Sequence, residues 1–449
     1  MLVVPISERE FDLYALSLPH GPNYDPFVIR SGWKSCDNRC VGVLLNDPNK
    51  GDIRVLVLRR QVDHRFVVTH QRAGLLSEDA ALNELLAAMR PDDPPEQIPP
   101  GVKRRQLLFQ PGSRPIGGYF KLLTGTVTHF PAWITIGEVY LAMPQPDGNF
   151  VPDFQTANFN SRLWELYLLA AFREQGICVT QDYPSPDFFI ERSGSDCYVE
   201  AVTANPNQSR LQGYAPPTFA TTDQKERLLG PPAVRFAKTL GSKLQRSYDS
   251  LPHVHGKPFA LAIADFHAPS SMVWSREALP CYLYGLHPQV MDGPNGPKAF
   301  GTPVDILLGE SDFPAGLFRD SSMTYLSAVI FSNAATLGKF NRMGYLAGWR
   351  PPGLKMVRDG LLFDRTPGAL QPIPFKLDIL SDEYTALWPL GEAWCQELEV
   401  YHNPIADRPV DFDLLPGATH WFECEGEIVC SSMWESSVVS SITHLTLEG

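Results

Sequence analysis

The 449-residue chain lacks the sequence signals by which several large classes of protein are recognised. It has no run of about eighteen apolar residues, which a membrane-crossing helix needs, and no basic and apolar leader of the secretory kind at its N-terminus. We therefore expect a cytoplasmic protein that does not use a membrane. The motifs GxxxxGK[ST], GxGxxG after a strand, HExxH and GxSxG are also missing. Their absence argues against P-loop, dinucleotide-binding, zinc-protease and α/β-hydrolase chemistry.

Cysteine is too sparse and too scattered to indicate a disulfide framework or a zinc site. The chain has eight cysteines, and its close pairs are Cys36 with Cys40 and Cys424 with Cys430. Neither pair has the C-x-x-C spacing or the neighbouring histidines of a structural zinc site. We expect free thiols.

Basic residues are scarce at the C-terminal end. Residues 376–449 carry 2 Lys and Arg against 14 Asp and Glu, which equals the net charge of −12 of the whole chain. Residues 1–150 are neutral, with 16 against 16, and residues 151–375 are also neutral. Because an acidic surface repels nucleic acid, we expect this end to face away from any nucleic acid, to cover a cleft, or to contact a partner protein.

Residues 1–150 have the pattern of an α+β accessory domain. Residues 52–60 and 65–69 read as paired strands, residues 77–89 as a helix capped by a serine, and residues 91–100 as a proline-rich loop.

The basic residues of this part are concentrated in a few places and could contact nucleic acid. Charge that protects an exposed strand edge explains them equally well. They are Arg59, Arg60, Arg65, Arg72 and the run Lys103 to Arg105.

The chemistry of the chain is concentrated between residues 160 and 203. Residues 160–176 have a polar start, a periodic apolar run and a final glycine, which predict a helix. Strands are expected at 177–180, 187–191 and 197–203. This places three carboxylates on three elements, namely Glu165, Asp187 and Glu200.

The turn between the last two strands sets their register. If the hairpin is centred between Ser193 and Gly194, Asp187 lies directly opposite Glu200. Opposed residues of an antiparallel pair have Cβ atoms about 4.5–5.5 Å apart, which suits two carboxylates that share a divalent ion. Without a cation the two charges repel each other, and one pKa rises.

Each acid also has an ordinary structural explanation. Glu165 can pair with Arg162 at i−3 spacing, Asp187 can cap the preceding turn, and Glu200 can face solvent. The apolar neighbours of Glu200 favour a strand that is buried on both faces, where an acid is costly unless it is paired or bound to a metal.

The order of a helix acid, a Pro-Asp strand and a Glu on the next strand resembles the PD-(D/E)XK nuclease superfamily. Residues 222–250 read as a helical segment interrupted at a Pro-Pro pair, and residues 257–266 as a further strand. The resemblance implies a restriction-endonuclease-like αβββαβ core within residues 151–267. By this resemblance Asp187 and Glu200 bind Mg²⁺ or Mn²⁺, and Glu165 matches the helix acid of a subset of members.

One residue departs from the pattern. The family places a lysine two residues after the second acid, and this chain has Val202 there. That lysine orients the attacking water and stabilises developing charge, which an alkyl group cannot do. Substitutes from neighbouring elements are Gln181, Lys225, Lys238 and Lys243. The alternative is a domain that has lost catalysis.

Six basic residues follow the motif strands and are candidates for nucleic-acid binding. A solvated helix face explains them equally well. They are Lys225, Arg227, Arg235, Lys238, Lys243 and Arg246.

Residues 268–449 are expected to form a mixed C-terminal extension that packs on the core. His267, Asn341 and Arg342 are candidates to complete a site, although single residues of this kind are more often structural. The sequence as a whole predicts a metal-dependent nuclease that acts on DNA or RNA, with a role in bacterial defence, restriction or repair and with oligomerisation open. The alternative is an inactive nuclease-fold module that binds nucleic acid or a partner protein.

Overall fold

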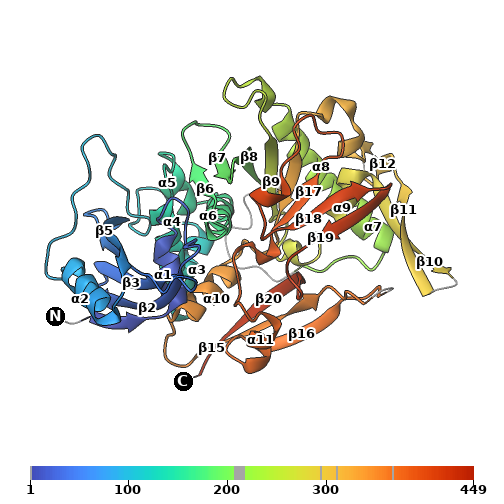
Figure 1. The fold of residues 1–449 in the computed structure, drawn as a ribbon. Helices are drawn as coiled ribbons and strands as arrows, with labels where there is room; N and C mark the ends of the chain where they lie inside the picture. The colour runs from blue at the N-terminus through green and yellow to red at the C-terminus, as the bar shows by residue number, and fades with distance from the viewer. Residues whose placement is uncertain (1–2, 207–217, 294–295, 310–311, 367–368, 449) are drawn as a thin grey trace.

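The computed structural model describes residues 3–206, 218–293, 296–309, 312–366 and 369–448. These residues form a mixed α/β structure with several sheets, as the sequence predicts at that level. Figure 1 shows the N-terminal part at one end of the molecule, the largest sheet towards the other end, and a smaller C-terminal sheet below. Within the described residues, no helix has both the length and the apolar character needed to cross a membrane.

The N-terminal part is an antiparallel sheet with a helix on each face. Its five strands follow chain order and are β1 (Val3–Ile6), β2 (Val28–Ser35), β3 (Cys40–Asn46), β4 (Ile53–Arg60) and β5 (Phe66–Leu75). Apolar side chains of α1 (Glu8–Ala15) pack on one face, and those of α2 (Glu78–Met89) pack on the other. The predicted strand pair and the predicted helix are confirmed, and the Ser77 hydroxyl caps α2 by accepting the Ala80 N–H.

A helical layer connects this sheet to the rest of the molecule. It consists of α3 (Gly118–Gly125), α4 (Phe130–Ala142), α5 (Phe150–Phe154) and α6 (Phe159–Glu174). The predicted helix at 160–176 is α6, and the chain leaves it through Gly176, whose φ of +77° suits a residue without a Cβ.

The largest sheet has eight strands in the order β19-β18-β17-β14-β9-β8-β7-β6. Their bounds are β6 (Cys178–Thr180), β7 (Phe188–Arg192), β8 (Ser195–Ala204), β9 (Phe259–Asp265), β14 (Ala328–Phe331), β17 (Glu399–His402), β18 (Thr419–Cys424) and β19 (Glu427–Ser431). Half of these strands come from beyond residue 268. The sheet therefore continues across the expected boundary between core and C-terminal extension.

Helices cover both faces of this sheet. The core that includes α6 lies on one face, and the core that includes α7 (Gln224–Leu229), α8 (Pro231–Leu244) and α9 (Ala278–Tyr284) lies on the other. The predicted interruption of the 222–250 helical segment is confirmed as a break between α7 and α8 at Gly230. A Cβ there would lie 2.3 Å from the Glu226 carbonyl oxygen, so only glycine fits.

The remaining elements complete the C-terminal half. A three-stranded sheet has the order β16-β15-β20 and accompanies two helices. The bounds are β10 (Leu286–Gly293), β11 (Gly296–Pro303), β12 (Ile306–Leu307), β13 (Phe313–Pro314), α10 (Leu337–Ala347), β15 (Leu354–Leu362), β16 (Ile373–Asp378), α11 (Asp382–Leu387) and β20 (Val438–Leu447). Short 3₁₀ turns are η1 (Val127–His129), η2 (Tyr248–Ser250), η3 (Ser271–Val273), η4 (Leu317–Arg319), η5 (Ser321–Met323), η6 (Cys395–Glu397) and η7 (Phe412–Leu414).

A buried ionic network joins α10 and β15 to the segment before β17. Lys339 Nζ lies 2.8 Å from Glu392 Oε1 and 3.1 Å from Glu397 Oε2. Arg342 binds Glu392, and Arg358 binds Glu397. All five side chains are at most 3% exposed. Part of the acidic excess of residues 376–449 is thus neutralised inside the protein and does not contribute to an acidic surface.

Candidate functional site

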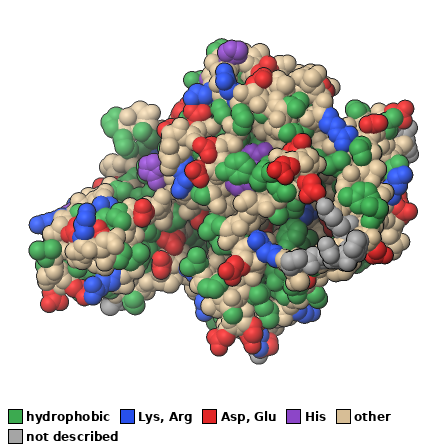
Figure 2. Space-filling model, turned by 45° about the vertical axis from the view of Figure 1, so that its right-hand side comes forward, with side chains coloured by type: hydrophobic (Ala, Val, Ile, Leu, Met, Phe, Trp, Pro, Cys, Tyr) green, Lys and Arg blue, Asp and Glu red, His purple; other side chains and the backbone are tan. Residues whose placement is uncertain are grey.

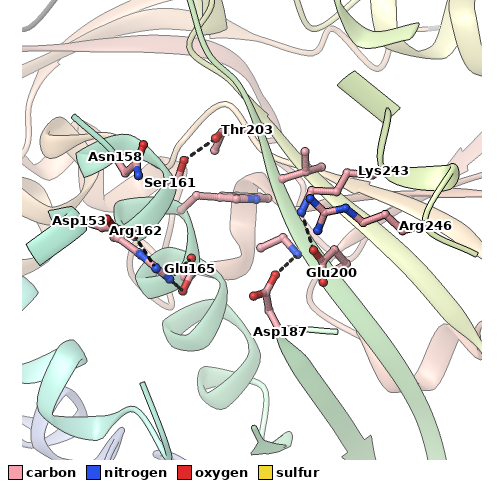
Figure 3. Close-up of a pocket in the computed structure, with 13 residues that line it drawn as sticks. Asp153, Asn158, Ser161, Arg162, Glu165, Asp187, Glu200, Thr203, Lys243 and Arg246 are labelled. Carbon is pink, nitrogen blue, oxygen red and sulfur yellow. Dashed lines mark hydrogen bonds and ion pairs between the residues drawn. The ribbon is translucent and has the colours of Figure 1, made fainter. Parts of the chain in front are cut away.

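The three carboxylates singled out in the sequence line one pocket of about 500 Å³. Glu165 lies on α6, Asp187 immediately precedes β7, and Glu200 lies in the middle of β8. Figure 3 shows Asp187 between the other two acids in this view. The pocket lies where α6 meets the hairpin of β7 and β8.

The hairpin has the predicted register. Phe188 pairs with Val199 and Arg192 with Ser195, which places Asp187 opposite Glu200 just beyond the end of the ladder. Ser193 and Gly194 form the turn with φ of 53° and 88°, the positive values that a two-residue type I′ turn requires. The Asp187 carboxylate turns towards β8 and accepts the Ala201 N–H at 2.8 Å.

Glu200 is buried on the strand and holds a lysine. It is 4% exposed, which confirms the prediction of a buried strand. Lys243 Nζ, from the last turn of α8, lies 2.5 Å from Glu200 Oε1, and the Ser185 hydroxyl donates to Oε2 at 3.2 Å. Side chains alternate along a strand, so Val202 shares a face with Glu200, and it packs in the core that includes α8. Lys243 therefore brings an ammonium group to the strand face on which the motif lysine is missing.

Glu165 is held by an arginine. Arg162 Nη1 lies 3.0 Å from Glu165 Oε1, so the ion pair considered from the i−3 spacing is present, but it is largely shielded from solvent, with side chains 13% and 11% exposed. The same guanidinium lies 2.8 Å from Asp153 Oδ2 and 2.7 Å from Asp147 Oδ2. Arg162 thus contacts three carboxylates, of which Asp153 also lies 3.8 Å from Arg114, and the surroundings of Glu165 keep an excess of negative charge.

The electrostatics of the pocket favour an additional cation. Burial, followed by the negative charge of Asp187, raises the pKa of Glu165 to about 8. Burial, followed by the charge of Glu200, raises the pKa of Asp187 to about 7. Closely spaced carboxylates that repel each other are the donors that a divalent cation stabilises in the ionised form.

We tested whether these residues suit Mg²⁺ or Mn²⁺. Both ions prefer oxygen ligands, and Asp187 and Glu200 present carboxylate oxygens to the same pocket. Among the described residues, however, no three His, Cys, Asp or Glu side chains converge closely enough to form a complete metal site. Arg162 and Lys243 occupy oxygens of Glu165 and Glu200. The chemistry of the donors fits a divalent cation, for which Asp187 and Glu200 would be the ligands.

The other predicted site residues are divided between this pocket and more distant positions. Arg246 lines the pocket beside Lys243. Gln181 lines an adjoining groove and donates to the Asp187 carbonyl at 3.3 Å. Asn341 and Arg342 are buried, and neither lines the pocket or the groove.

The remaining predicted basic residues line neither cavity. Lys225 is exposed on α7, and Arg227 lies 3.4 Å from Glu277. Arg235 is half-buried on α8, and Lys238 lies over the Phe313 ring. Of the six candidates for nucleic-acid binding, the pocket brings together Lys243 and Arg246.

Sequence reasoning missed the polar end of the pocket. Asn158, Ser161 and Thr203 line it, and the hydroxyls of Ser161 and Thr203 lie 2.6 Å apart. Asp153 was missed as well, since its link to Arg162 spans nine residues and belongs to no local pattern. The helix period places Ser161 one turn before Glu165, which is the one signal available.

Comparisons of the chain with protein-family models, with curated proteins and with solved structures found no match.

Proposed function

We propose that this protein is a divalent-metal-dependent nuclease. The observation that carries the proposal is the meeting of Asp187 and Glu200 across the β7–β8 hairpin, with Lys243 Nζ 2.5 Å from Glu200, in a single pocket. Two acids and an ammonium group from three separate elements are the parts that hydrolysis of a phosphodiester by metal-activated water requires.

Topology supports a restriction-endonuclease-like core as part of the proposal. The chain runs from α6 through β6, β7 and β8 to the helices α7 and α8, and then to β9, which pairs in parallel with β8. This is the αβββαβ order that the sequence predicts. The acids lie where the helix meets the first hairpin of that order.

Each residue has a defined task in this proposal. Asp187 and Glu200 would hold Mg²⁺ or Mn²⁺, which supplies Lewis-acid activation of water and of the phosphate. The Ala201 N–H orients the Asp187 carboxylate. Because Ala201 follows Glu200 on β8, this hydrogen bond fixes Asp187 relative to Glu200. Lys243 neutralises Glu200 and would stabilise negative charge that develops on the phosphate. Arg246 lines the same pocket and would attract the phosphate group.

A specific observation favours a second candidate, an inactive module that binds nucleic acid or protein. Arg162 and Lys243 already satisfy Glu165 and Glu200, which is how a domain without a metal would neutralise buried acids. Such a module would not hydrolyse nucleic acid, and substitution of Asp187 or Glu200 would change no cleavage rate.

Cleavage of labelled plasmid, single-stranded DNA and RNA with Mg²⁺ or Mn²⁺ tests the proposal. We expect Asp187→Asn and Glu200→Gln each to abolish cleavage. Glu191→Gln is the matched control, because Glu191 lies on the same hairpin, is exposed and does not line the pocket. Cleavage that persists in both acid variants, or that never occurs with any of the substrates, would count against a nuclease.

A further inference from the structure

A second cavity adjoins the carboxylate pocket. This groove has a volume of about 700 Å³ and shares Glu165 and Asp187 with the pocket. Residues 101–106 of the N-terminal part form its first wall, and residues 181–184 between β6 and β7 form a second wall. Two segments that are distant in the chain therefore meet at a groove that two of the three acids also line.

The first wall presents two uncompensated cations. Lys103 and Arg104 are exposed and line the groove, and neither forms an ion pair with any residue that the structure describes. Arg104 donates to the Val62 carbonyl at 3.3 Å, which positions its guanidinium and leaves its charge in place. On the face shown in Figure 2, basic and acidic side chains are interspersed.

The loop that carries these cations is anchored by its neighbour. Arg105 is 8% exposed, and its guanidinium donates to the carbonyls of Met143 and Pro144 at the end of α4. Its backbone N–H donates to Asp63 Oδ2 at 2.9 Å. Because Arg105 is anchored in this way, the backbone positions of Lys103 and Arg104 at the groove are restrained.

The second wall presents an aromatic ring. Tyr183 is 47% exposed although one face of its ring is covered, since it stacks on His253 with centroids 3.8 Å apart and planes 3° apart. His253 is itself held by a hydrogen bond of 2.9 Å to the Ser185 carbonyl. A rigid aromatic ring with an open face is a platform on which an unpaired base stacks.

Four carboxylates also line the groove. Asp147 pairs with Arg162 at 2.7 Å, Asp182 precedes Tyr183 in the chain, and Glu165 and Asp187 are the acids shared with the carboxylate pocket. For a strand in the groove, Lys103 and Arg104 would offer contacts for phosphates, Tyr183 would offer a contact for a base, and the shared acids would mark the place of cleavage.

We propose that this groove binds a single-stranded nucleic acid through Lys103, Arg104 and Tyr183 and directs it to the carboxylate pocket. This inference rests on the proposed nuclease function, because it assigns cleavage to the acids that the groove shares with the pocket. A cavity of this size fits a strand of a few nucleotides, and stacking on Tyr183 needs a base that is not paired.

Fluorescence anisotropy of labelled single-stranded and duplex oligonucleotides tests the groove. Binding is measured in EDTA, so that it does not depend on cleavage. The charge-reversal variant Lys103→Glu with Arg104→Glu is expected to weaken single-strand binding roughly tenfold or more. It is also expected to reduce the slope of log affinity against log salt by about 1.4, for two lost phosphate contacts. The matched control, Lys50→Glu with Lys121→Glu, makes the same charge change at exposed positions outside the groove and should bind like the wild type.

Substitutions at Tyr183 distinguish the contribution of base stacking to binding from that of charge. Tyr183→Ala should weaken binding roughly 5- to 150-fold with an unchanged salt slope, and Tyr183→Phe should retain binding. Equal affinity of the groove variant and its control, or tighter binding of duplex than of single strand, would overturn the inference.

The two proposals fail in different ways. If the groove variants lose binding while no substrate is cleaved, the groove stands and the nuclease falls. If cleavage depends on Asp187 but the groove variants bind and cleave like the wild type, the nuclease stands and the groove falls.

Discussion

The substitution Lys243→Met tests whether an ammonium group from α8 performs the task of the missing motif lysine. Methionine retains most of the length of the side chain and removes the charge next to Glu200, whose carboxylate lies 2.5 Å away. Removing one preorganised group that stabilises developing charge typically lowers kcat by about 10²- to 10³-fold. We expect a loss of that size in the rate of cleavage under saturating substrate, with little change in KM.

The same substitution also affects stability, and the size of that effect follows from burial. The Glu200 side chain is 5% exposed and that of Lys243 is 21% exposed. Breaking a buried ion pair costs about 3–5 kcal/mol, and the partial exposure of Lys243 places the expected loss at or below the lower end. Added Mg²⁺ should restore part of this stability in urea denaturation, because it compensates the unpaired carboxylate.

Two further variants separate catalysis from stability. Lys238→Met removes a lysine from the same helix outside the pocket and should leave cleavage unchanged. Val202→Lys combined with Lys243→Met returns an ammonium group to the motif position and should recover cleavage. If Lys243→Met cleaves as fast as Lys238→Met when both are folded, Lys243 has only a structural role and the reasoning is refuted.

Three other predictions concern neighbouring parts of the molecule. Glu392→Gln leaves three buried cations, Lys339, Arg342 and Arg358, with Glu397 as their one remaining carboxylate, and should lower the free energy of unfolding by about 3–5 kcal/mol in urea, with unchanged cleavage per folded molecule. Glu165→Gln should reduce cleavage less than Asp187→Asn in the plasmid assay, because Arg162 already holds Glu165. Burial, opposed by the Tyr24 hydrogen bond, raises the pKa of Asp12 to about 7 from an unfolded value of 3.8. The folded state therefore binds more protons between these values, and stability falls as pH rises through them. In urea denaturation, the free energy of unfolding of Asp12→Asn relative to that of the wild type should increase by up to about 3 kcal/mol from pH 5 to pH 8.

Local sequence signals were sufficient for the elements that carry the acids. The Ser193 and Gly194 turn sets the register, since a two-residue turn leaves one way to align the flanking strands. The period of α6 and its terminal Gly176 fixed the helix that carries Glu165. These features depend on residues that are close in the chain, so the opposition of Asp187 and Glu200 was predictable.

Contacts between distant segments were not predictable. The sequence could not rank Gln181, Lys225, Lys238 and Lys243 as substitutes for the lysine, because the ion pair of Lys243 with Glu200 depends on how α8 packs on the strand face of Val202. Likewise, Lys103 and Arg104 form a basic run in the sequence, but their position in the same groove as Tyr183 depends on the anchoring of Arg105 at the end of α4. β14 and β17 join the same sheet as β8 through pairings that are remote in the chain, such as Ala328 with Ala260 of β9 and Ala328 with His402 of β17.

Asp187 gives the sharpest distinction between a nuclease and an inactive module. Among the described residues, no Lys, Arg or His forms an ion pair with it, and the hydrogen bond that it accepts from Ala201 would be made equally well by the neutral oxygen of asparagine. A carboxylate that faces Glu200 without a partner destabilises the fold, whereas Glu200 and Glu165 at least have Lys243 and Arg162. We therefore expect Asp187→Asn to raise the urea midpoint of unfolding in EDTA while it abolishes cleavage with Mn²⁺. A lower midpoint than that of the wild type would assign Asp187 a structural role, and the strongest physical argument for a metal in this pocket would be lost.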